Sequence, residues 1–512
     1  MLQRLELLVA EALTELGVNE TKGVKLDIPP RRELGDYATN AAIVCARRLS
    51  RQPLELAEAI AARVKSDMFD RVEVVKPGFI NFFLNEQFIQ QSVLGIIAKD
   101  RAWGKGTKGL GTKILLEFVS ANPTGPLHVG HGRWAVIGDA IARLLKAAGY
   151  GVETEFYVNN IGNQVDKLWE SVQAARSGQP VPENGYGGAY IKDVKGNSQE
   201  ECLSSILSEQ KTTLKQLGVE FTRFFNESDL HAKGEVKEAI GRLAKNGKTM
   251  VEEGAVWFKS QEMGDDKNRV LVRADGTPTY FAADLAYHLD KYARGFDRLI
   301  DIWGTDHHGY VKRVKAAVAA MGLPAEKLEI IIGQLVTLYR GDEPVRMSKR
   351  TGEMVTLQEV IDETGADATR FFFAATDVNS HLDFDLELAK KQSSDNPVYY
   401  VQYAHARICS IIKKAGEEER RGKADLSTLT EPAERELMLK LISWPDVVEG
   451  AARLRQPHKV TEYGKELATV FHHFYEKCRV IGNPARLVLV DASRITLRNV
   501  LELLGIKAPE AM

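Results

Sequence analysis

One stretch, residues 113–151, constrains the fold more than any other part of this 512-residue chain. It opens with an apolar run at 114–119, which predicts a buried strand, and then passes through a turn broken by prolines and glycines. Gly149 stands where a C-terminal helix cap is expected. Before it, apolar residues recur at helical spacing, at Ile137, Ile141, Leu144, Leu145 and Ala148. Strand, turn and helix in this order are typical of an α/β fold.

Two histidines, His128 and His131, stand with Gly130 where this strand gives way to the helix. Backbone N–H groups and the positive end of the helix dipole favour a bound anion at such a junction, phosphate above all. The tetrapeptide HVGH at 128–131 resembles the HIGH signature of class I aminoacyl-tRNA synthetases, and its flank SANPTGPL at 120–127 resembles the arginyl type. Because H-x-G-H also occurs by chance and histidines often serve as caps, the interpretation depends on partners elsewhere in the chain.

Length and composition leave the function open. A chain of this length is expected to form about two to four domains. The formal net charge of −2 argues against a general nucleic-acid coat protein, but a tRNA partner needs only a local basic face. No apolar run is as long as a membrane span, and residues 1–17 predict an amphipathic helix rather than a signal peptide, so no membrane partner is expected.

Cysteine usage bears on location and metal content. The sequence has four cysteines and no C-x-x-C pair, so we expect reduced thiols, a cytoplasmic location and no protein-bound zinc. They are Cys45, Cys202, Cys409 and Cys478.

The first 110 residues predict a small α+β domain. Helices are expected at 2–16, 40–49 and 54–65, and strands at 72–75 and 79–84. The segments GDYATN at 35–40 and PGFIN at 77–81 resemble the N-terminal domain of arginyl-tRNA synthetases, which implies contact with the D-loop and elbow of tRNA. Five arginines are candidate phosphate contacts or, equally, a solvated face: Arg31, Arg32, Arg47, Arg48 and Arg51.

Residues 111–392 predict a Rossmann-like catalytic domain with a doubly wound parallel sheet. Further strands of that sheet are expected at 152–158, 268–272, 298–303 and 328–332. The segment at about 160–270 is mostly helical and polar, and we interpret it as an insertion between the two halves of the sheet.

From 393 to 512 the pattern is helical throughout and predicts an α-helical bundle. The C-terminus LLGIKAPEAM resembles that of arginyl-tRNA synthetases, which implies an anticodon-binding domain. Candidate RNA-facing charges are Lys413, Lys414, Arg420, Arg421 and Lys423. Tyr399, Tyr400 and Tyr403 are candidates for stacking on bases, although their helical spacing favours the core.

A second signature supports the first. The segment VRMSKRTG at 345–352 resembles the KMSKS loop of class I enzymes, with Arg346 in place of the first lysine. A basic loop facing a triphosphate neutralises charge as pyrophosphate departs, so Lys349 is expected to contact the leaving group. The resemblance also assigns Met347, Ser348 and Arg350 to ATP. Taken alone, the run would be a solvated basic loop.

Between the two signatures lies WGTDHHG at 303–309, directly after a predicted strand. The carboxyl end of such a strand borders the ligand crevice of a doubly wound sheet. By resemblance to class I enzymes, Gly304 and Asp306 contact the ribose or adenosine of ATP, as Gly130 contacts its phosphates, and His307 faces the amino acid.

Arginine recognition requires acceptors, because a guanidinium offers five donors and a permanent charge. Glu117 lies in the middle of an apolar strand, where an unpaired charge is costly. Tyr280 and Asp284 are one helical turn apart and share a face. By resemblance, Glu117 and Asn122 hold the α-amino end of arginine, and Tyr280 with Asp284 holds the guanidinium. Edge-strand and helix-surface positions are the alternatives for the two acids.

The resemblance implies an arginine–tRNA ligase that uses ATP with Mg²⁺ and activates arginine only when tRNA is bound. Arginyl-adenylate and pyrophosphate form first, and arginine is then transferred to the 3′-terminal adenosine of its tRNA. Two rivals stay open at this point. One is an adenylating enzyme of the same superfamily with another amino acid or acceptor, and the other is a non-catalytic tRNA-binding relative.

Overall fold

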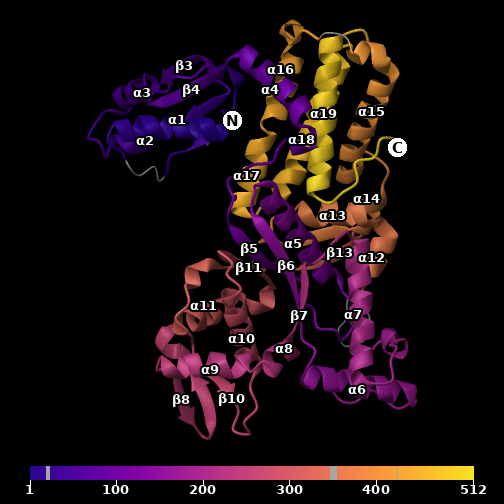
Figure 1. Cartoon of the computed structure of the whole chain (residues 1–512). Coiled ribbons are helices and arrows are strands. Elements are labelled where there is room, and N and C mark those ends of the chain that lie inside the picture. The colour runs from indigo at the N-terminus through magenta and orange to yellow at the C-terminus, as the bar shows by residue number, and fades with distance from the viewer. Residues whose placement is uncertain (19–22, 346–354, 422–423) are drawn as a thin grey trace.

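The computed structural model describes residues 1–512 except 19–22, 346–354 and 422–423, and it describes only the backbone of residues 3, 32, 306 and 417–421. The chain forms an N-terminal α/β part, a central α/β part and a C-terminal helical part (Figure 1). Among the described residues, no helix is both long and apolar enough to cross a membrane.

The N-terminal part is a four-stranded antiparallel sheet covered by helices. The sheet order is β1-β2-β4-β3, which places the central strand β4 between β2 and β3. The strands predicted at 72–75 and 79–84 are confirmed as parts of β3 and β4. Asn85 caps the next helix by accepting from the N–H of Phe88. The elements are α1 (Leu2–Glu15), β1 (Leu26–Asp27), β2 (Tyr37–Thr39), α2 (Ala41–Ala46), α3 (Pro53–Ala61), β3 (Phe69–Val75), β4 (Phe79–Leu84) and α4 (Glu86–Lys99).

The central part is built on five parallel strands in the order β12-β11-β5-β6-β7. They are β5 (Lys113–Glu117), β6 (Gly151–Val158), β7 (Arg223–Asn226), β11 (Arg298–Gly304) and β12 (Leu328–Gly333). The chain runs outward from β5 through β6 to β7 and then returns to the other side of β5. The strand order therefore reverses between β5 and β11, which is where a doubly wound sheet opens its ligand crevice.

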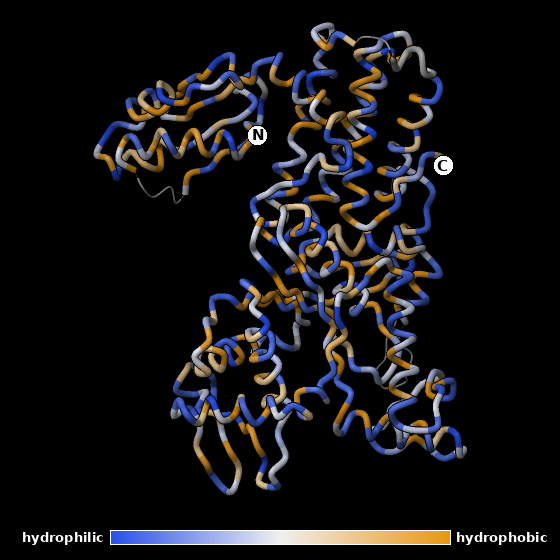
Figure 2. Tube along the Cα trace, in the orientation of Figure 1, coloured by the Kyte–Doolittle hydropathy of each residue, from blue (hydrophilic) through white to orange (hydrophobic). Residues whose placement is uncertain are grey.

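Both faces of this sheet are buried. Ile114 and Leu116 belong to the larger hydrophobic core, while Leu115, which points to the opposite face, belongs to a second core. Helix α5 (Val129–Ala147) packs on the first face, and α10 (Tyr280–Ala293) and α11 (Tyr310–Ala320) pack on the second. Figure 2 shows the hydrophobic segments following the central strands and alternating with polar ones along the helices.

Two expectations for the central part are wrong. The strand predicted at 268–272 is β10 (Arg269–Val272), which belongs to a separate antiparallel sheet with β9 (Ala255–Phe258) and β8 (Thr249–Glu252). The proposed insertion at 160–270 contains β7, so it is not simply an addition between two halves of the sheet. Only four residues long, with Arg223 and Asn226 at its ends, β7 lacks the apolar run that marks a buried strand.

Apart from β7, the regular elements between residue 160 and the start of β8 are helical. Its helices are α6 (Asn163–Arg176), α7 (Gln199–Gln216), α8 (Glu227–Ala232) and α9 (Glu235–Lys245). Helices α6 and α7 share a small core of their own around Leu168 and Ile206.

A second three-stranded sheet, which the sequence did not predict, follows the parallel sheet. It has the order β14-β13-β15, with β13 (Val336–Arg340), β14 (Glu343–Pro344) and β15 (Leu382–Asp385). The helices around it are α12 (Leu357–Thr364), α13 (Ala366–Ala374) and α14 (Leu386–Lys390).

The C-terminal part confirms the predicted helical bundle. Among the described residues after 393, every regular element is a helix, and Gly416 (φ +76°) kinks α15. Tyr400 is half-buried and packs against the main hydrophobic core, as its helical spacing predicted, whereas Tyr403 is exposed, so the core interpretation is wrong for Tyr403; Tyr399 is half-buried. The main helices are α15 (Pro397–Arg421), α16 (Pro432–Ile442), α17 (Trp444–Leu454), α18 (His458–Lys477) and α19 (Pro484–Leu503).

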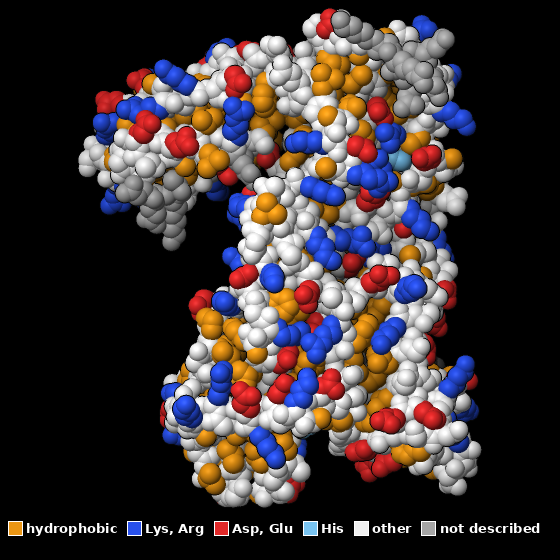
Figure 3. All heavy atoms as spheres, in the orientation of Figure 1, with side chains coloured by type: hydrophobic (Ala, Val, Ile, Leu, Met, Phe, Trp, Pro, Cys, Tyr) orange, Lys and Arg blue, Asp and Glu red, His pale blue; other side chains and the backbone are white. Residues whose placement is uncertain are grey.

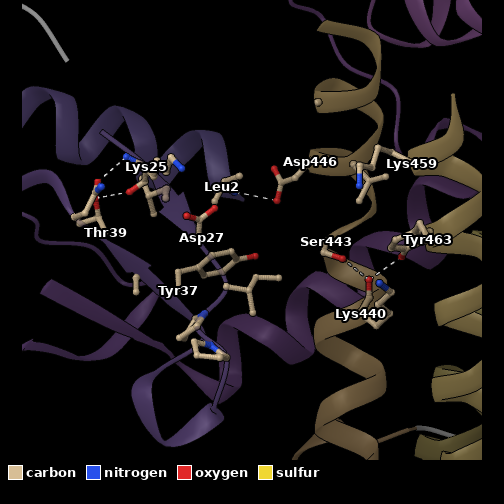
Figure 4. A pocket seen from close by; sticks show the side chains of 18 of the residues that line it. Leu2, Lys25, Asp27, Tyr37, Thr39, Lys440, Ser443, Asp446, Lys459 and Tyr463 are labelled. Atoms are coloured by element: carbon tan, nitrogen blue, oxygen red, sulfur yellow. Dashed lines mark hydrogen bonds between the residues drawn. The ribbon is translucent and has the colours of Figure 1, made fainter. Parts of the chain in front are cut away.

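The N-terminal and helical parts meet through polar contacts. Asp446, in the first turn of α17, accepts from the N-terminal ammonium at 2.9 Å and from the N–H of Leu2 at 3.0 Å. Arg435 pairs with both oxygens of Asp36. Beside these contacts the two parts enclose a cavity of about 1080 Å³, lined from one side by Tyr37 and from the other by Tyr463 (Figure 4). None of the described residues predicted for catalysis or for ATP and arginine binding lines this cavity.

Candidate active site

The two signature histidines cap helix α5. His128 is the N-cap, and its Nδ1 accepts from the N–H of Gly130 at 3.1 Å and from that of His131 at 3.4 Å. His131 Nδ1 accepts in return from the N–H of His128 at 3.3 Å. The two rings stack with their centroids 3.6 Å apart. Because each Nδ1 is an acceptor, the neutral rings carry their protons on Nε2. The pair therefore presents N–H donors at the positive end of a helix.

Gly130 is required by this arrangement. A Cβ atom at this position would lie 2.9 Å from Cε1 of His128, which is closer than side chains tolerate. The predicted ATP-binding role of Gly130 stays a prediction, but the need for glycine follows from the capping geometry.

The turn between β5 and α5 is strained and braced. Val119 (φ +69°) and Ser120 (φ +41°) lie in the left-handed region, which is unusual for a β-branched residue. Ser120 Oγ donates to Glu117 at 2.7 Å and accepts from the N–H of Tyr157 at 3.1 Å. Further along, the buried side chain of Gln210 donates to the backbone carbonyls of residues 122 and 125. The exposed side chain of Asn122 is thus carried on a fixed backbone.

Glu117 is the last residue of β5 and is buried, so the edge-strand alternative is wrong. Its Oε2 accepts from Nζ of Lys291 at 2.5 Å, and Lys291 also donates to Asp301 at 2.8 Å. Asp301 is paired with Glu117 in register across β5 and β11. Glu117 therefore lies at the reversal of strand order, where the crevice is expected.

Asp284 lies one turn into α10 with a partly buried side chain, so it is not an ordinary helix-surface acid. Its Oδ1 is 3.3 Å from Nδ1 of His288, whereas its buried Oδ2 has no hydrogen-bond partner among the described residues. The exposed Tyr280 begins the same helix. Burial, and next the charge of Asp284, raise the pKa of the Tyr310 phenol well above its ordinary value. Asp284 thus keeps acceptor capacity at a buried oxygen beside the Tyr310 phenol.

Glu227 is a site residue that the sequence interpretation missed. It begins α8 directly after β7 and is only 4% exposed. Burial raises its pKa to about 7; a hydrogen bond from Tyr157 lowers it, and the charge of Asp284 raises it further. The charge of Glu227 in turn contributes to a raised pKa of Tyr280, after burial. Recognising β7 as a strand of the parallel sheet would have placed Glu227 at the crevice.

The structure describes only some of the residues that were predicted to bind ATP. Gly304 ends β11 and pairs in register with Gly333 of β12. His307 is exposed, and its ring centroid lies 5.9 Å from that of Trp303. The side chain of Asp306 lies outside the described residues, as do Arg346, Met347, Ser348, Lys349 and Arg350.

The two flanks of the second signature are described. On its N-terminal side, the N–H of Val345 donates to Leu338 at 2.9 Å. On its C-terminal side, Thr356 forms a β-bridge with His128, and the N–H of Leu357 donates to Leu127 at 2.7 Å. The chain thus returns from the second signature directly to the first.

No metal centre is built from the residues that the structure describes. They contain no group of three or more histidine, cysteine, aspartate or glutamate side chains arranged to hold a metal ion. The four cysteines are all unpaired thiols.

Family models match three consecutive segments of the chain. Residues 3–84 match the arginyl tRNA synthetase N terminal domain, residues 93–184 and 189–387 match the catalytic domain of tRNA synthetases class I (R), and residues 401–512 match the DALR anticodon binding domain.

Relatives of known sequence and structure agree with these matches. The chain is 44% identical to an arginine–tRNA ligase of Moorella thermoacetica, over 98% of this chain and 96% of the relative. A crystal structure of a putative arginyl-tRNA synthetase from Campylobacter jejuni is 33% identical with a TM-score of 0.78, covering 84% of this chain and 100% of the other. The Thermus thermophilus arginyl-tRNA synthetase superposes over the full length of both chains with a TM-score of 0.82 at 24% identity, which bears on the fold alone.

Proposed function

The chain belongs to the arginyl-tRNA synthetase family and activates arginine for attachment to tRNA, and we propose that this chemistry takes place at the carboxyl edge of the five-stranded parallel sheet. One observation carries this placement. Two reciprocally capped histidines at the start of α5 and a buried chain of carboxylates meet where the strand order reverses between β5 and β11. Neither rival hypothesis, another adenylating enzyme or a non-catalytic relative, is supported by the comparisons.

ATP is a substrate, and we assign its phosphates to the start of α5. The arginine carboxylate attacks the α-phosphorus, a new P–O bond forms, and the bond to pyrophosphate breaks. Nε2–H donors of His128 and His131 and the N–H groups near Gly130 stabilise the charge on the phosphates in the transition state. Lys349 neutralises the departing pyrophosphate. No protein nucleophile is needed, so positioning and electrostatics supply the catalysis.

We assign the remaining ATP contacts from the family motifs. Gly304 and Asp306 hold the nucleoside, and Met347, Ser348 and Arg350 hold the triphosphate. Mg²⁺ enters with ATP and is bound by the phosphates, which are its preferred ligands, and no zinc is required.

We assign arginine to the carboxylates on the other side of the turn. Glu117 and the exposed Asn122 take the α-ammonium; each oxygen of Glu117 has one protein donor and keeps a second lone pair for substrate. Asp284 and Tyr280 take the guanidinium, joined by Glu227, and His307 closes the pocket. Two acids near one guanidinium suit a planar donor with five N–H groups.

The partner is tRNA, and the DALR match assigns residues 401–512 to its anticodon. We propose domain limits of 1–110, 111–392 and 393–512, with the first contacting the D-loop and elbow. Arg31, Arg47, Arg48 and Arg51 are exposed there, and Lys413 and Lys414 are exposed on α15. Figure 3 shows both signs of charge interspersed, with lysine and arginine side chains clustered across the middle of this face. Reduced thiols and these substrates support a cytoplasmic location.

The test of the proposal is pyrophosphate exchange with each amino acid, with and without tRNA. Arginine alone should support exchange, and only when tRNA is present. Transfer to the 2′-hydroxyl of the terminal adenosine should follow. If no exchange occurs with arginine and tRNA together, the assignment of this site is wrong.

A further inference from the structure

A continuous chain of charged side chains links the two ends of the proposed arginine pocket. Glu117 contacts Lys291 at 2.5 Å, and Lys291 contacts Oδ1 of Asp301 at 2.8 Å. Oδ2 of Asp301 is 3.1 Å from Nε2 of His288. Nδ1 of His288 donates to the backbone carbonyl of Asp284 at 2.8 Å and lies 3.3 Å from its Oδ1. The three inner members belong to α10 and β11 and are at most 1% exposed.

The charge of this chain is unbalanced. Burial opposes protonation of His288, but Asp284 and Asp301 outweigh it and raise its pKa to about 10, so the ring is a cation at neutral pH. Lys291 is also charged, because Asp301 and Glu117 overcome the effect of burial and raise its pKa. With all three carboxyl groups ionised, two cations against Glu117, Asp301 and Asp284 leave one negative charge. Burial raises the pKa of Glu117, and the contact with Lys291 acts against that rise and favours the carboxylate.

The position of that negative charge is defined by the contacts. Glu117 and Asp301 both accept from Lys291, whereas Oδ2 of Asp284 is buried and has no hydrogen-bond partner among the described residues. The carboxylate oxygen with unused acceptor capacity therefore lies at the proposed guanidinium end of the pocket. Substrate arginine carries a net positive charge and would neutralise the chain.

We propose that Lys291, Asp301 and His288 are positioning residues for arginine, which orient Glu117 and Asp284 and direct the uncompensated charge to Asp284. This inference rests on the proposed function, because it requires that Glu117 and Asp284 contact the amino acid. None of the three side chains touches substrate. They act by fixing the two carboxylates that do, since a buried carboxylate without its partner would shift or take up a proton.

A second ion pair, between the buried Glu155 and Arg294 at the C-cap of α10, provides the contrast. Arg294 donates to both oxygens of Glu155 at 2.6 and 2.8 Å, and Tyr287 donates to the same carboxylate at 2.7 Å. Both oxygens of Glu155 are thus satisfied within the protein, and Arg294 also contacts Asp290 at 2.9 Å. The Lys291 chain differs because its two ends, Glu117 and Asp284, are the carboxylates assigned to arginine.

The experiment compares Lys291→Met with Arg294→Met in tRNA-dependent pyrophosphate exchange. Lys291→Met should raise the KM for arginine about tenfold to a hundredfold while the KM for ATP changes less than about twofold. Arg294→Met also breaks a buried pair, so it should lower the melting temperature while leaving the ratio of the two KM values unchanged. The double variant Glu117→Gln with Lys291→Met should raise the arginine KM by less than the product of the factors for the two single variants, because the two residues act together.

Each outcome has a distinct meaning. If Lys291→Met changes both KM values by the same factor, or if Arg294→Met shifts their ratio equally, the positioning role is refuted. His288→Gln, which removes the charge next to Asp284, gives the same test if Lys291→Met fails to fold. Asp284→Asn separates the two proposals. If Asp284→Asn raises the arginine KM and Lys291→Met does not, only the positioning role fails. If Asp284→Asn leaves the arginine KM unchanged, the pocket assignment itself fails.

Discussion

His128 and His131 hold each other in place: each Nδ1 accepts the backbone N–H of the other residue, at 3.3 and 3.4 Å. The signature motif is therefore a helix cap as well as a candidate catalytic pair. The capping alternative and the catalytic hypothesis are not exclusive, because capping occupies Nδ1 and catalysis would use Nε2.

Replacing His128 with asparagine should separate capping from catalysis. Asparagine is a good N-cap, so stability should change by less than about 0.5 kcal/mol, whereas loss of the Nε2–H donor should lower the rate of adenylate formation about 10²- to 10³-fold. His128→Ala loses both functions and should cost about 1 kcal/mol more in stability. Thermal unfolding and pyrophosphate exchange provide the readouts. An asparagine variant with an unchanged rate would leave His128 as a cap alone.

Asp284→Ala should raise the KM for arginine by about 10²-fold or more while the KM for ATP stays within about twofold, because it removes the acceptor for a fixed cation. The matched control is Asp290→Ala on the same helix, whose carboxylate pairs with Arg294 instead. Exchange kinetics at varied arginine and varied ATP measure both constants. Equal losses for the two substrates would contradict the pocket assignment.

Glu227 should make arginine binding pH-dependent. Its pKa is raised to about 7, and only the carboxylate form attracts a guanidinium, which does not titrate in this range. The arginine KM should therefore rise about tenfold between pH 8 and pH 6, and Glu227→Gln should abolish that dependence. A Glu227→Gln enzyme with the same pH profile would place the titration elsewhere.

Glu227 should affect the stability of the free enzyme in the opposite direction: arginine binding weakens as the pH falls, whereas its contribution to stability grows. Because its folded pKa exceeds that of an unfolded glutamate, Glu227 binds a proton preferentially in the folded state between about pH 4.5 and 7. Its contribution to the free energy of unfolding is therefore present at the acid end of that window and is lost as pH rises through 7. Wild type and Glu227→Gln, unfolded by urea at several pH values, should differ in this direction.

Lys349→Ala should slow adenylate formation and leave arginine affinity little changed, because the lysine is assigned to pyrophosphate and not to the amino acid. Single-turnover formation of adenylate, with tRNA bound, measures the step directly. A variant that loses arginine affinity and keeps its rate would contradict the assignment.

Substitution by alanine should lower the stability of the protein at Gly138 in α5 and raise it at Gly95 in α4. A Cβ at Gly138 would lie 2.2 Å from the ring of the buried Phe118, so Gly138→Ala should destabilise by about 1–3 kcal/mol through overpacking. Gly95 has no neighbour within 4 Å of a built Cβ, so Gly95→Ala should stabilise by about 0.5–1 kcal/mol through helix propensity. Urea unfolding of both variants checks the signs. Equal effects would mean that α5 can move away from β5.

Local patterns in the sequence determined much of the fold and the family. Helical periodicity predicted α5 and the C-terminal bundle, and the resemblance of 128–131 and 345–352 to family signatures predicted the activity. Each of these features is contained in a short local stretch of sequence, so it can be recognised without knowledge of the rest of the chain. Strand β7 was missed for the same reason, because its few residues carry no periodic signal of their own.

The pocket, in contrast, was decided by tertiary structure. Sequence showed that Glu117 sat in an apolar strand, but not that Lys291, 174 positions away, would be its partner. Nor did it show that Glu227 would lie beside Asp284. A buried charge is stabilised by whichever opposite charge the fold brings within a few ångströms, and that distance depends on strand order rather than on spacing along the chain.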